Sequence, residues 1–292
     1  MNKNVAQKGM HWQLHSVPEM GDAEFVRWAG LLEVHTGISL PVARKSFLVT
    51  SVALRMREIN CPDYSSYYAL VTSGPGGAME WSVLVDRLTV HETRFFRHKS
   101  SLDLLARHLK THYDRPGSLH INAWSAGCAT GEEAYSIAMV IEQQFGARRG
   151  KNYYGVTGTD ISLAALDSAR RGEYHRRRLL ALEPEQMESY FTQVDDEHYQ
   201  VCERLRKRIC FTRINMLEPM TPTLGGMDVI FCQNVLIYFN RRQRTEILNK
   251  IAECLRPGGL LVLGPGEIMQ WSSPGLERVL YEDTLAYYRT PL

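Results

Sequence analysis

Residues Ile121–Gln143 read INAWSAGCATGEEAYSIAMVIEQ. A short apolar run is followed by a turn of small residues, and from Glu132 onward apolar residues recur at helical spacing. This order predicts a strand, a glycine-rich loop and a helix, the unit from which parallel α/β sheets are built. Glycine turns of this kind usually bind phosphate, yet two adjacent carboxylates, Glu132 and Glu133, stand at the mouth of this one.

Strand and helix patterns continue to alternate after this unit. Strands are predicted at 119–124, 152–160, 227–234 and 260–264, helices at 162–172 and 241–255, a turn at 257–259, and two short strands within 276–289. Alternation of this kind implies right-handed crossovers and a mainly parallel sheet. Ligands of such sheets bind beyond the carboxyl ends of the strands, so residues that directly follow each strand are the first candidates for a site.

Residues 173–213 interrupt the alternation and are too long for an ordinary connection. They contain two stretches of alternating polarity, HYQVCERL (198–205) and RICFTRI (208–214), which predict a small antiparallel β insert. Insertions of this kind often bind a partner.

The N-terminal part of the chain has a different texture. Residues 1–20 are polar and unpatterned and are expected to form a loose tail. From 21 to 110 the apolar spacing is helical, with Gly37 at the end of the first helix and the flexible SGPGG (73–77) between two later ones. We therefore expect an all-helical domain over 21–110 and an α/β domain over 111–292.

Bulk composition excludes some classes of protein. The 292 residues are 44% hydrophobic and 23% charged with a net charge of +2, which gives no argument for binding nucleic acid. No run of about 18 apolar residues and no apolar signal core occurs, so we expect a cytoplasmic protein that does not insert into a membrane. The six cysteines form no CxxC pair and no cluster with histidine at ligand spacing, which predicts free thiols and no metal site.

The loop between Gly127 and Gly131 does not match the common phosphate-binding motifs. It lacks the Lys-Ser/Thr of the P-loop and the G-x-G-x-x-G spacing of dinucleotide sites. A carboxylate would also repel a pyrophosphate. S-adenosylmethionine reverses that argument, because it carries a sulfonium, an ammonium and ribose hydroxyls that donate to carboxylates. We assign Glu133 to this ligand, and Glu132 to a favourable charge at the start of the helix.

Polar residues at the ends of other predicted strands support a nucleoside ligand. Asp160 ends the second strand, where an acidic side chain can bind ribose hydroxyls. Asn215 and Asn234 follow later strands with amides suited to adenine or to the amino acid end of the ligand. The alternatives are a helix cap for Asp160, a task that Ser162 could perform equally well, and simple turns for the asparagines.

Five motifs together closely resemble the CheR family: VHETRFFRH (90–98), WSAGCATGEEAYSIAM (124–139), GTDIS…AL..AR.GEY (158–174), INMLEP (214–219) and DVIFCQNVLIYFN (228–240). Its members are chemotaxis methyltransferases that esterify glutamates of bacterial chemoreceptors. The resemblance spans about residues 22–289. It implies a Rossmann-like α/β methyltransferase fold dependent on S-adenosylmethionine, with a mainly parallel sheet, an all-helical N-terminal domain and a small antiparallel β insert.

The resemblance also implies roles for particular residues. Those expected to bind the cofactor, which leaves as S-adenosylhomocysteine, are His91, Thr93, Arg97, Glu133, Asp160, Asn215, Met216, Gln233 and Asn234. Arg97 and Tyr238 are the expected catalytic residues. The partner is the cytoplasmic domain of a methyl-accepting chemoreceptor in a chemosensory adaptation pathway. The helical domain and the insert are expected to face it, and in some members the insert binds a receptor tail by strand addition.

Three positions depart from the family pattern. His91 replaces asparagine, Gln233 replaces arginine, and GPGE (264–267) replaces GHSE. Polar contact with the cofactor is retained at His91 and Gln233, whereas the GPGE segment loses a histidine and a serine. These departures leave open a binding protein of the same fold that senses S-adenosylmethionine without catalysis.

A glutamate carboxylate is already ionised at neutral pH, so esterification requires alignment rather than a strong base. Arg97 is expected to position that carboxylate, and Tyr238 to lie near the transferred methyl, with a core position as its alternative. Phe95 and Phe96 are expected to pack against the sheet. Two basic stretches are candidates for binding an acidic receptor surface: one contains Arg44, Lys45, Arg55 and Arg57, and the other Arg176, Arg177 and Arg178. Methyl transfer to nucleic acid or to a small acid is the competing enzymatic interpretation.

Overall fold

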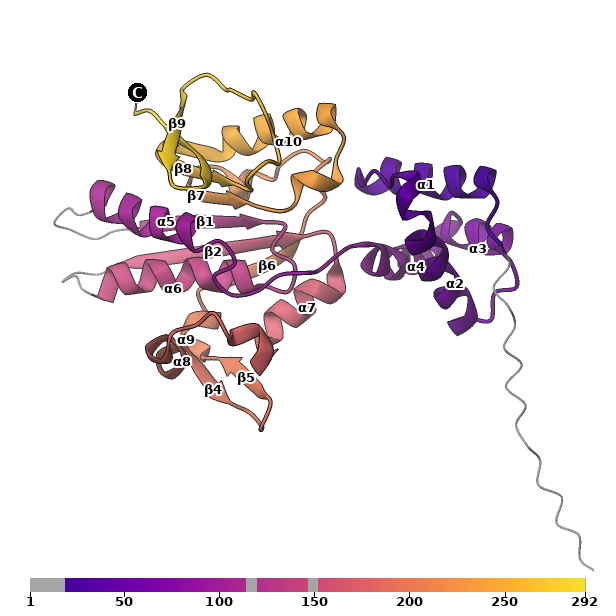
Figure 1. The fold of residues 1–292 in the computed structure, drawn as a ribbon, viewed down its shortest axis with the longest axis horizontal. Helices are drawn as coiled ribbons and strands as arrows, with labels where there is room; N and C mark the ends of the chain where they lie inside the picture. The colour runs from indigo at the N-terminus through magenta and orange to yellow at the C-terminus, as the bar shows by residue number, and fades with distance from the viewer. Residues whose placement is uncertain (1–18, 114–119, 147–151, 292) are drawn as a thin grey trace, which may run out of the picture.

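The computed structural model describes residues 19–113, 120–146 and 152–291, so the expected tail lies almost wholly outside the described residues. Figure 1 shows a helical module, α1 to α4, beside a larger body built around a sheet, with one extended connection between α4 and α5. The helical module is formed by α1 (Asp22–Thr36), the 3-10 turn η1 (Val42–Arg44), α2 (Lys45–Glu58), α3 (Tyr64–Val71) and α4 (Gly74–Leu88).

The helical module has its own core, which includes the fully buried Leu32, Tyr67 and Leu84. Helix α1 ends where the sequence predicts, at Gly37, whose φ of 77° is left-handed and suits glycine. The expected flexible SGPGG is not a linker, because α4 already begins at Gly74. A Cβ on Gly77 would lie 2.3 Å from the backbone oxygen of Leu70, so this glycine lets α4 pack closely against α3.

The main sheet has seven strands in the order β6-β2-β1-β7-β8-β10-β9. The first five are parallel to one another, and β10 is antiparallel to both of its neighbours, β8 and β9. Its strands are β1 (His120–Ala126), β2 (Tyr153–Asp160), β6 (Ile209–Arg213), β7 (Met227–Cys232), β8 (Leu255–Leu263), β9 (Leu276–Tyr281) and β10 (Thr284–Arg289). The predicted turn at 257–259 lies within β8, where the pairing register with β7 shifts. The Rossmann-like α/β architecture is confirmed.

Alternate side chains of the strands pack into two cores on opposite faces of the sheet. On β1, Ile121 and Ala123 belong to one core and Trp124 and Ala126 to the other. The first core is covered by α5 (Lys99–His112), α6 (Glu132–Gly146) and α7 (Leu163–Arg171), and the second by α10 (Arg241–Cys254). Helix α5, which the sequence grouped with the helical segment, thus packs with the sheet.

The insert forms a separate three-stranded antiparallel sheet in the order β3-β5-β4, below the main sheet in Figure 1. It comprises β3 (Glu173–His175), η2 (Arg176–Leu179), α8 (Pro184–Tyr190), β4 (Phe191–Gln193), β5 (His198–Val201) and α9 (Glu203–Arg206). The stretch RICFTRI was wrongly assigned to it. That stretch forms β6, which pairs in parallel with β2 and is one edge strand of the main sheet.

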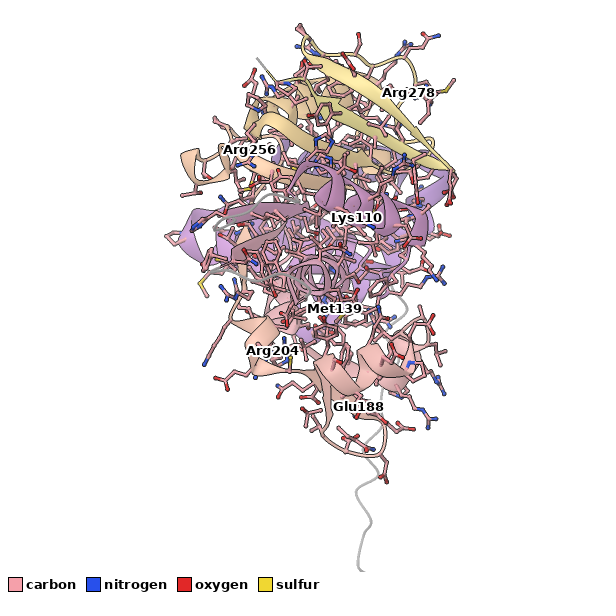
Figure 2. The ribbon with its side chains drawn as sticks, turned by 90° about the vertical axis from the view of Figure 1, so that its left-hand side faces the viewer. Lys110, Met139, Glu188, Arg204, Arg256 and Arg278 are labelled. Carbon is pink, nitrogen blue, oxygen red and sulfur yellow. The ribbon has the colours of Figure 1, made fainter. Side chains whose placement is uncertain are left out.

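Figure 2 views the end of the sheet away from the helical module, with Arg256 near that end and Glu188 and Arg204 of the insert below. Arg256 pairs there with the buried Asp228, which also accepts from Tyr113 Oη at 2.7 Å. All six cysteines are free. No helix among the described residues is long and apolar enough to cross a membrane, and those residues hold no group of three potential His, Cys, Asp or Glu metal ligands.

Candidate active site

A cavity of about 310 Å³ lies at the carboxyl ends of β1, β2, β6 and β7, and Thr36, Ile38 and Arg44 of the helical module also line it. The chain winds from β1 outward to β2 and β6, then returns to β7 on the other side of β1, so the cavity lies at the topological switch point of the sheet. Its walls include every site residue that the sequence predicts: His91, Thr93, Arg97, Glu133, Asp160, Asn215, Met216, Gln233, Asn234 and Tyr238.

The glycine-rich loop after β1 is folded tightly against the ends of its neighbours. Gly127 has φ of 77°, and a Cβ there would lie 2.2 Å from Val235 across the crevice between β1 and β7. The amides of Gly127 and Cys128 both donate to the carbonyl of Thr159, at 2.7 and 2.8 Å. Two amides of the loop are therefore already bonded to β2 and cannot bind a ligand. Side chains around the loop must supply much of the ligand binding.

Glu133 lines the cavity and accepts a hydrogen bond from Ser125 Oγ at 2.7 Å. Loss of solvation raises the pKa of its carboxyl to about 7, and the nearby Glu267 adds to this, while Ser125 and Arg97 oppose it. A bound cation or hydroxyl donor would relieve this unfavourable environment, which fits the ligand that the sequence assigns to Glu133.

Glu132 proves to be more than a favourable charge at a helix start. Its side chain is completely buried and pairs with Arg178 of the insert at 2.5 Å, while Thr130 Oγ1 donates to it at 2.6 Å. The two glutamates therefore point in different directions, Glu133 into the cavity and Glu132 toward the insert. The sequence could not reveal the partner of Glu132, because Arg178 is 46 residues away along the chain.

Asp160 closes the side of the cavity formed by β2. Its Oδ2 accepts from the amide of Ala129 at 2.9 Å and its Oδ1 from the amide of Ser162 at 2.9 Å. Burial raises its pKa, and these hydrogen bonds and His91 oppose the shift. The N-cap of α7 is Ser162, whose Oγ accepts from Ala165, so Asp160 is not itself the cap. Each carboxylate oxygen retains a lone pair for a ligand.

The three predicted amide side chains all have protein partners. Asn215 donates to the carbonyl of His35 and accepts from Leu217, and Asn234, in a left-handed conformation with φ of 61°, contacts His98 Nε2 at 3.0 Å. Gln233 is buried, and its amide nitrogen donates to Ser101 Oγ and to the carbonyl of Leu263. Its Oε1 is the atom left to face a ligand.

The connection between the two bodies, residues 89–98, forms another wall of the cavity. Its path is fixed by Arg97 Nη1, which donates to the carbonyl of Glu92 at 2.8 Å, and by the amide of Phe96, which donates to Ser136 Oγ at 3.1 Å. Phe95 is fully buried, as expected, although against Tyr174 and Phe191 of the insert. Phe96 instead lines the cavity, contrary to expectation.

Tyr238 lies half-buried where the helical module meets the sheet. Burial raises the pKa of its phenol, and the positive charges of Arg44 and Arg97 oppose this. The carbonyl of Tyr238 accepts from the amide of Ser39 at 2.8 Å. At the adjacent Gly37 a Cβ would lie 2.7 Å from the ring of Phe239, so this glycine permits the module to approach the loop.

Sequence reasoning missed several residues that build the cavity. Arg44 and His98 line it, although Arg44 appeared in the sequence only as part of a basic stretch. Glu267, the last residue of GPGE, is buried and accepts from the amides of Leu236 and Gly264, both at 2.9 Å. It thereby fixes the loop that carries Asn234 and Tyr238. The sequence did contain one signal for Glu267: it is a lone glutamate that closely follows an apolar strand.

Two carboxylates and several amides around a cavity at the switch point fit a ligand with cationic and hydroxyl groups, not a polyphosphate. Fold and site together define the class of methyltransferases that use S-adenosylmethionine. Within this class, the model of the CheR methyltransferase SAM binding domain matches residues 91–284, and that of the CheR methyltransferase all-alpha domain matches residues 23–89. The chain therefore belongs to the CheR methyltransferase family.

Curated relatives agree with this assignment. A chemotaxis protein methyltransferase of Klebsiella aerogenes is 34% identical, covering 85% of this chain and 84% of the relative. That of Escherichia coli is 33% identical over 85% of each chain, and chemotaxis protein methyltransferase 2 of Pseudomonas aeruginosa is 32% identical over 80% and 81%. Among solved structures, magnesium protoporphyrin IX methyltransferase from Synechocystis with bound S-adenosylmethionine is 14% identical, covering 82% of this chain and 97% of that one, with a TM-score of 0.38.

Proposed function

We propose that this methyltransferase esterifies glutamate side chains on the cytoplasmic domain of a bacterial chemoreceptor. One observation carries the proposal: Arg44, Arg97 and Tyr238 line the same cavity as Glu133 and Asp160. The two carboxylates suit a cationic cofactor, and the two arginines suit a carboxylate substrate. The names of the curated relatives support a role in chemotaxis.

The chemistry fits these residues because little proton transfer is needed. S-adenosylmethionine supplies a methyl group on a sulfonium, and a glutamate with an ordinary pKa of about 4.3 is already a carboxylate at neutral pH. The protein must align this weak nucleophile and exclude water from it. Arg97 positions the carboxylate, Arg44 attracts it, and the half-buried Tyr238 shields the reacting groups.

The basic residues proposed to recognise the receptor differ in whether their charge is already paired within the protein. Arg55 is held between Glu80 and Glu58, and Lys45 pairs with Asp22, so much of the charge on α2 is neutralised within the module. Arg44 is the member of that stretch that lines the cavity. On the insert, Arg176 and Arg177 are exposed, and the outer strands β3 and β4 offer edges to which an extended receptor segment could add.

The test is an assay for base-labile methyl groups. The protein is incubated with methyl-labelled S-adenosylmethionine and receptor-bearing membranes, and the washed membranes are treated with mild base. We expect volatile labelled methanol, which carboxyl esters release and N-methyl groups do not.

Three results would contradict the proposal in different ways. Label in a small acid would indicate another acidic substrate. Base-stable label would indicate chemistry on nitrogen or nucleic acid. Tight cofactor binding without any transfer, even to a mixture of receptor types, would indicate a sensor of S-adenosylmethionine.

A further inference from the structure

One arginine of the insert, Arg178, contacts two parts of the cofactor-binding region at once. Arg178, in η2, directs Nη1 to Glu132 Oε1 at 2.5 Å, to Thr130 Oγ1 at 3.2 Å and to the carbonyl of Thr93 at 3.4 Å. These three acceptors belong to the first turn of α6, the glycine-rich loop and the connection between the two bodies. One side chain of the insert therefore joins two walls of the cavity.

Glu132 makes this contact energetically important. Its side chain is completely buried, and among the described residues Arg178 is the cation paired with it, itself 42% exposed. A buried carboxylate that loses its cation keeps the cost of desolvation without compensation. Without Arg178, we expect Glu132 to turn toward water, and the first turn of α6 would have to move with it.

That movement would reach the cofactor directly. Successive side chains of a helix point about 100° apart, so Glu132 and Glu133 share one backbone turn while facing the insert and the cavity respectively. The direction of Glu133 is therefore set in part by the contact that Glu132 makes. Thr93, whose carbonyl Arg178 also binds, lines the same cavity.

Other residues of the insert hold the same loop from the same side. Tyr174 Oη donates to the carbonyl of Thr130 at 2.6 Å, and a Cβ on Gly131 would lie 3.1 Å from that hydroxyl oxygen. Phe95 packs edge-on against Tyr174 and Phe191, with ring centroids 4.9 and 5.3 Å apart. The insert thus packs against both the loop and the connection, independently of the ion pair.

We infer that Arg178 is a positioning residue for S-adenosylmethionine: through the buried Glu132, it holds the loop and the connection in the geometry that binds the cofactor. The insert then serves the cofactor site, whatever it also does for a partner. This inference rests on cofactor binding and not on the proposed receptor substrate, so binding measurements test it even if the substrate is another acid.

The test compares variants of two neighbouring arginines in the full-length protein. Titration calorimetry with S-adenosylhomocysteine should give a Kd about tenfold higher for Arg178→Ala than for the parent. Arg178→Lys keeps the charge without the guanidinium fork and should weaken binding by about threefold. Arg177→Ala removes an exposed arginine of the same turn and should leave Kd within about twofold.

A second readout separates positioning from a loss of folding. Hydrogen exchange without ligand should rise in residues 127–133 of Arg178→Lys and remain unchanged in β7 and β8. In steady-state assays the KM for S-adenosylmethionine should rise more than kcat falls. If Arg178→Ala fails to fold, Tyr174→Phe, which removes only the hydroxyl that binds Thr130, should raise Kd by about threefold.

Two outcomes would overturn the inference. One is an unchanged Kd in Arg178→Lys and Tyr174→Phe. The other is a melting temperature that falls equally with and without S-adenosylhomocysteine, which would show that the ion pair stabilises the insert alone.

Discussion

The helical module and the insert both reach the same cavity, but they do so with different chemistry. The module contacts the loops after β6 and β7 mainly through backbone groups and a glycine: the amide of Ser39 donates to the carbonyl of Tyr238, Asn215 donates to the carbonyl of His35, and Gly37 allows close approach. One charged group takes part, Glu33, which accepts from Asn240. The insert contacts the loop after β1 through the hydroxyl of Tyr174 and, in addition, through the charged pair of Arg178 and the buried Glu132. The module thus shapes the part of the cavity around Tyr238 and Asn215, and the insert shapes the loop that leads to Glu133.

The difference teaches how each contact can be broken. A neutral contact made through backbone groups and a glycine depends on shape, so added volume should disrupt it. A contact made through a buried charge depends on electrostatics, so removal of one of the two charges should disrupt it. Each of the following changes is directed at one of these regions of the cavity.

The largest effect should come from Gly37→Val. A Cβ there would lie 2.7 Å from the Phe239 ring and 2.9 Å from Leu217, at a φ of 77° that valine rarely adopts. We expect the free energy of unfolding, measured with urea, to fall by about 3 kcal/mol. Gly30→Ala is the matched control in the same helix, because its Cβ meets nothing within 4 Å, and it should stabilise the protein by about 0.5 kcal/mol. A loss below about 1 kcal/mol for Gly37→Val would show that the module does not fit closely here.

The next effect concerns pH and the cofactor side. Glu133 has a pKa raised to about 7, so its protonated form predominates below that pH in the ligand-free protein. If the carboxylate is the form that binds, the Kd for S-adenosylmethionine should be about tenfold higher at pH 6 than at pH 8. The stability of the ligand-free protein should fall over the same pH range in which affinity for the cofactor rises. A raised pKa contributes stability at low pH, and that stability is lost as pH rises through 7.

Glu133→Gln provides the control for this pH dependence. It should bind the cofactor more weakly than the parent at pH 8, and its Kd should vary little between pH 6 and 8. A Kd of the parent protein that is equal at both pH values would remove Glu133 from the set of cofactor residues.

The smallest effect should distinguish two adjacent cations on the substrate side. Arg44 lines the cavity, whereas Lys45 pairs with Asp22 on the module. Arg44→Ala should raise the KM for receptor about fivefold, as expected for one partly exposed charge, and leave the Kd for S-adenosylhomocysteine unchanged. Lys45→Ala should change neither constant by more than about twofold. Equal effects of both substitutions would favour a broad basic face over a specific residue at the cavity.

Local signals in the sequence predicted much of the fold. Ser162 and Gly172 bracket α7 as cap and stop, and the apolar run before Gly127 became β1. The predicted elements were wrong where packing against a neighbouring helix or strand decided the structure of a segment. The segment SGPGG joined α4 because Gly77 packs on Leu70, and RICFTRI became β6 because β2 offered it an edge.

The candidate site shows the same division. Spacing and residue type, with the family resemblance, identified ten residues that the structure brings around one cavity. Their individual partners were not predictable. Both amide hydrogens of Gln233 are used by Ser101 and Leu263, and Glu267 holds the loop of Tyr238 through backbone groups that any sequence would carry.

By itself, the sequence determined the order of strands and helices, the glycine loop, and the acidic character of its mouth, because periodicity and charge are local properties of the chain. The residue types also assigned Glu133, rather than Glu132, to the ligand. Only the tertiary structure decided what Glu132 does, which is to pair with the insert. A helix turns by about 100° per residue, so Glu132 and Glu133 had to point apart. The direction of each was fixed by Arg178 and Ser125, which only folding brings to them.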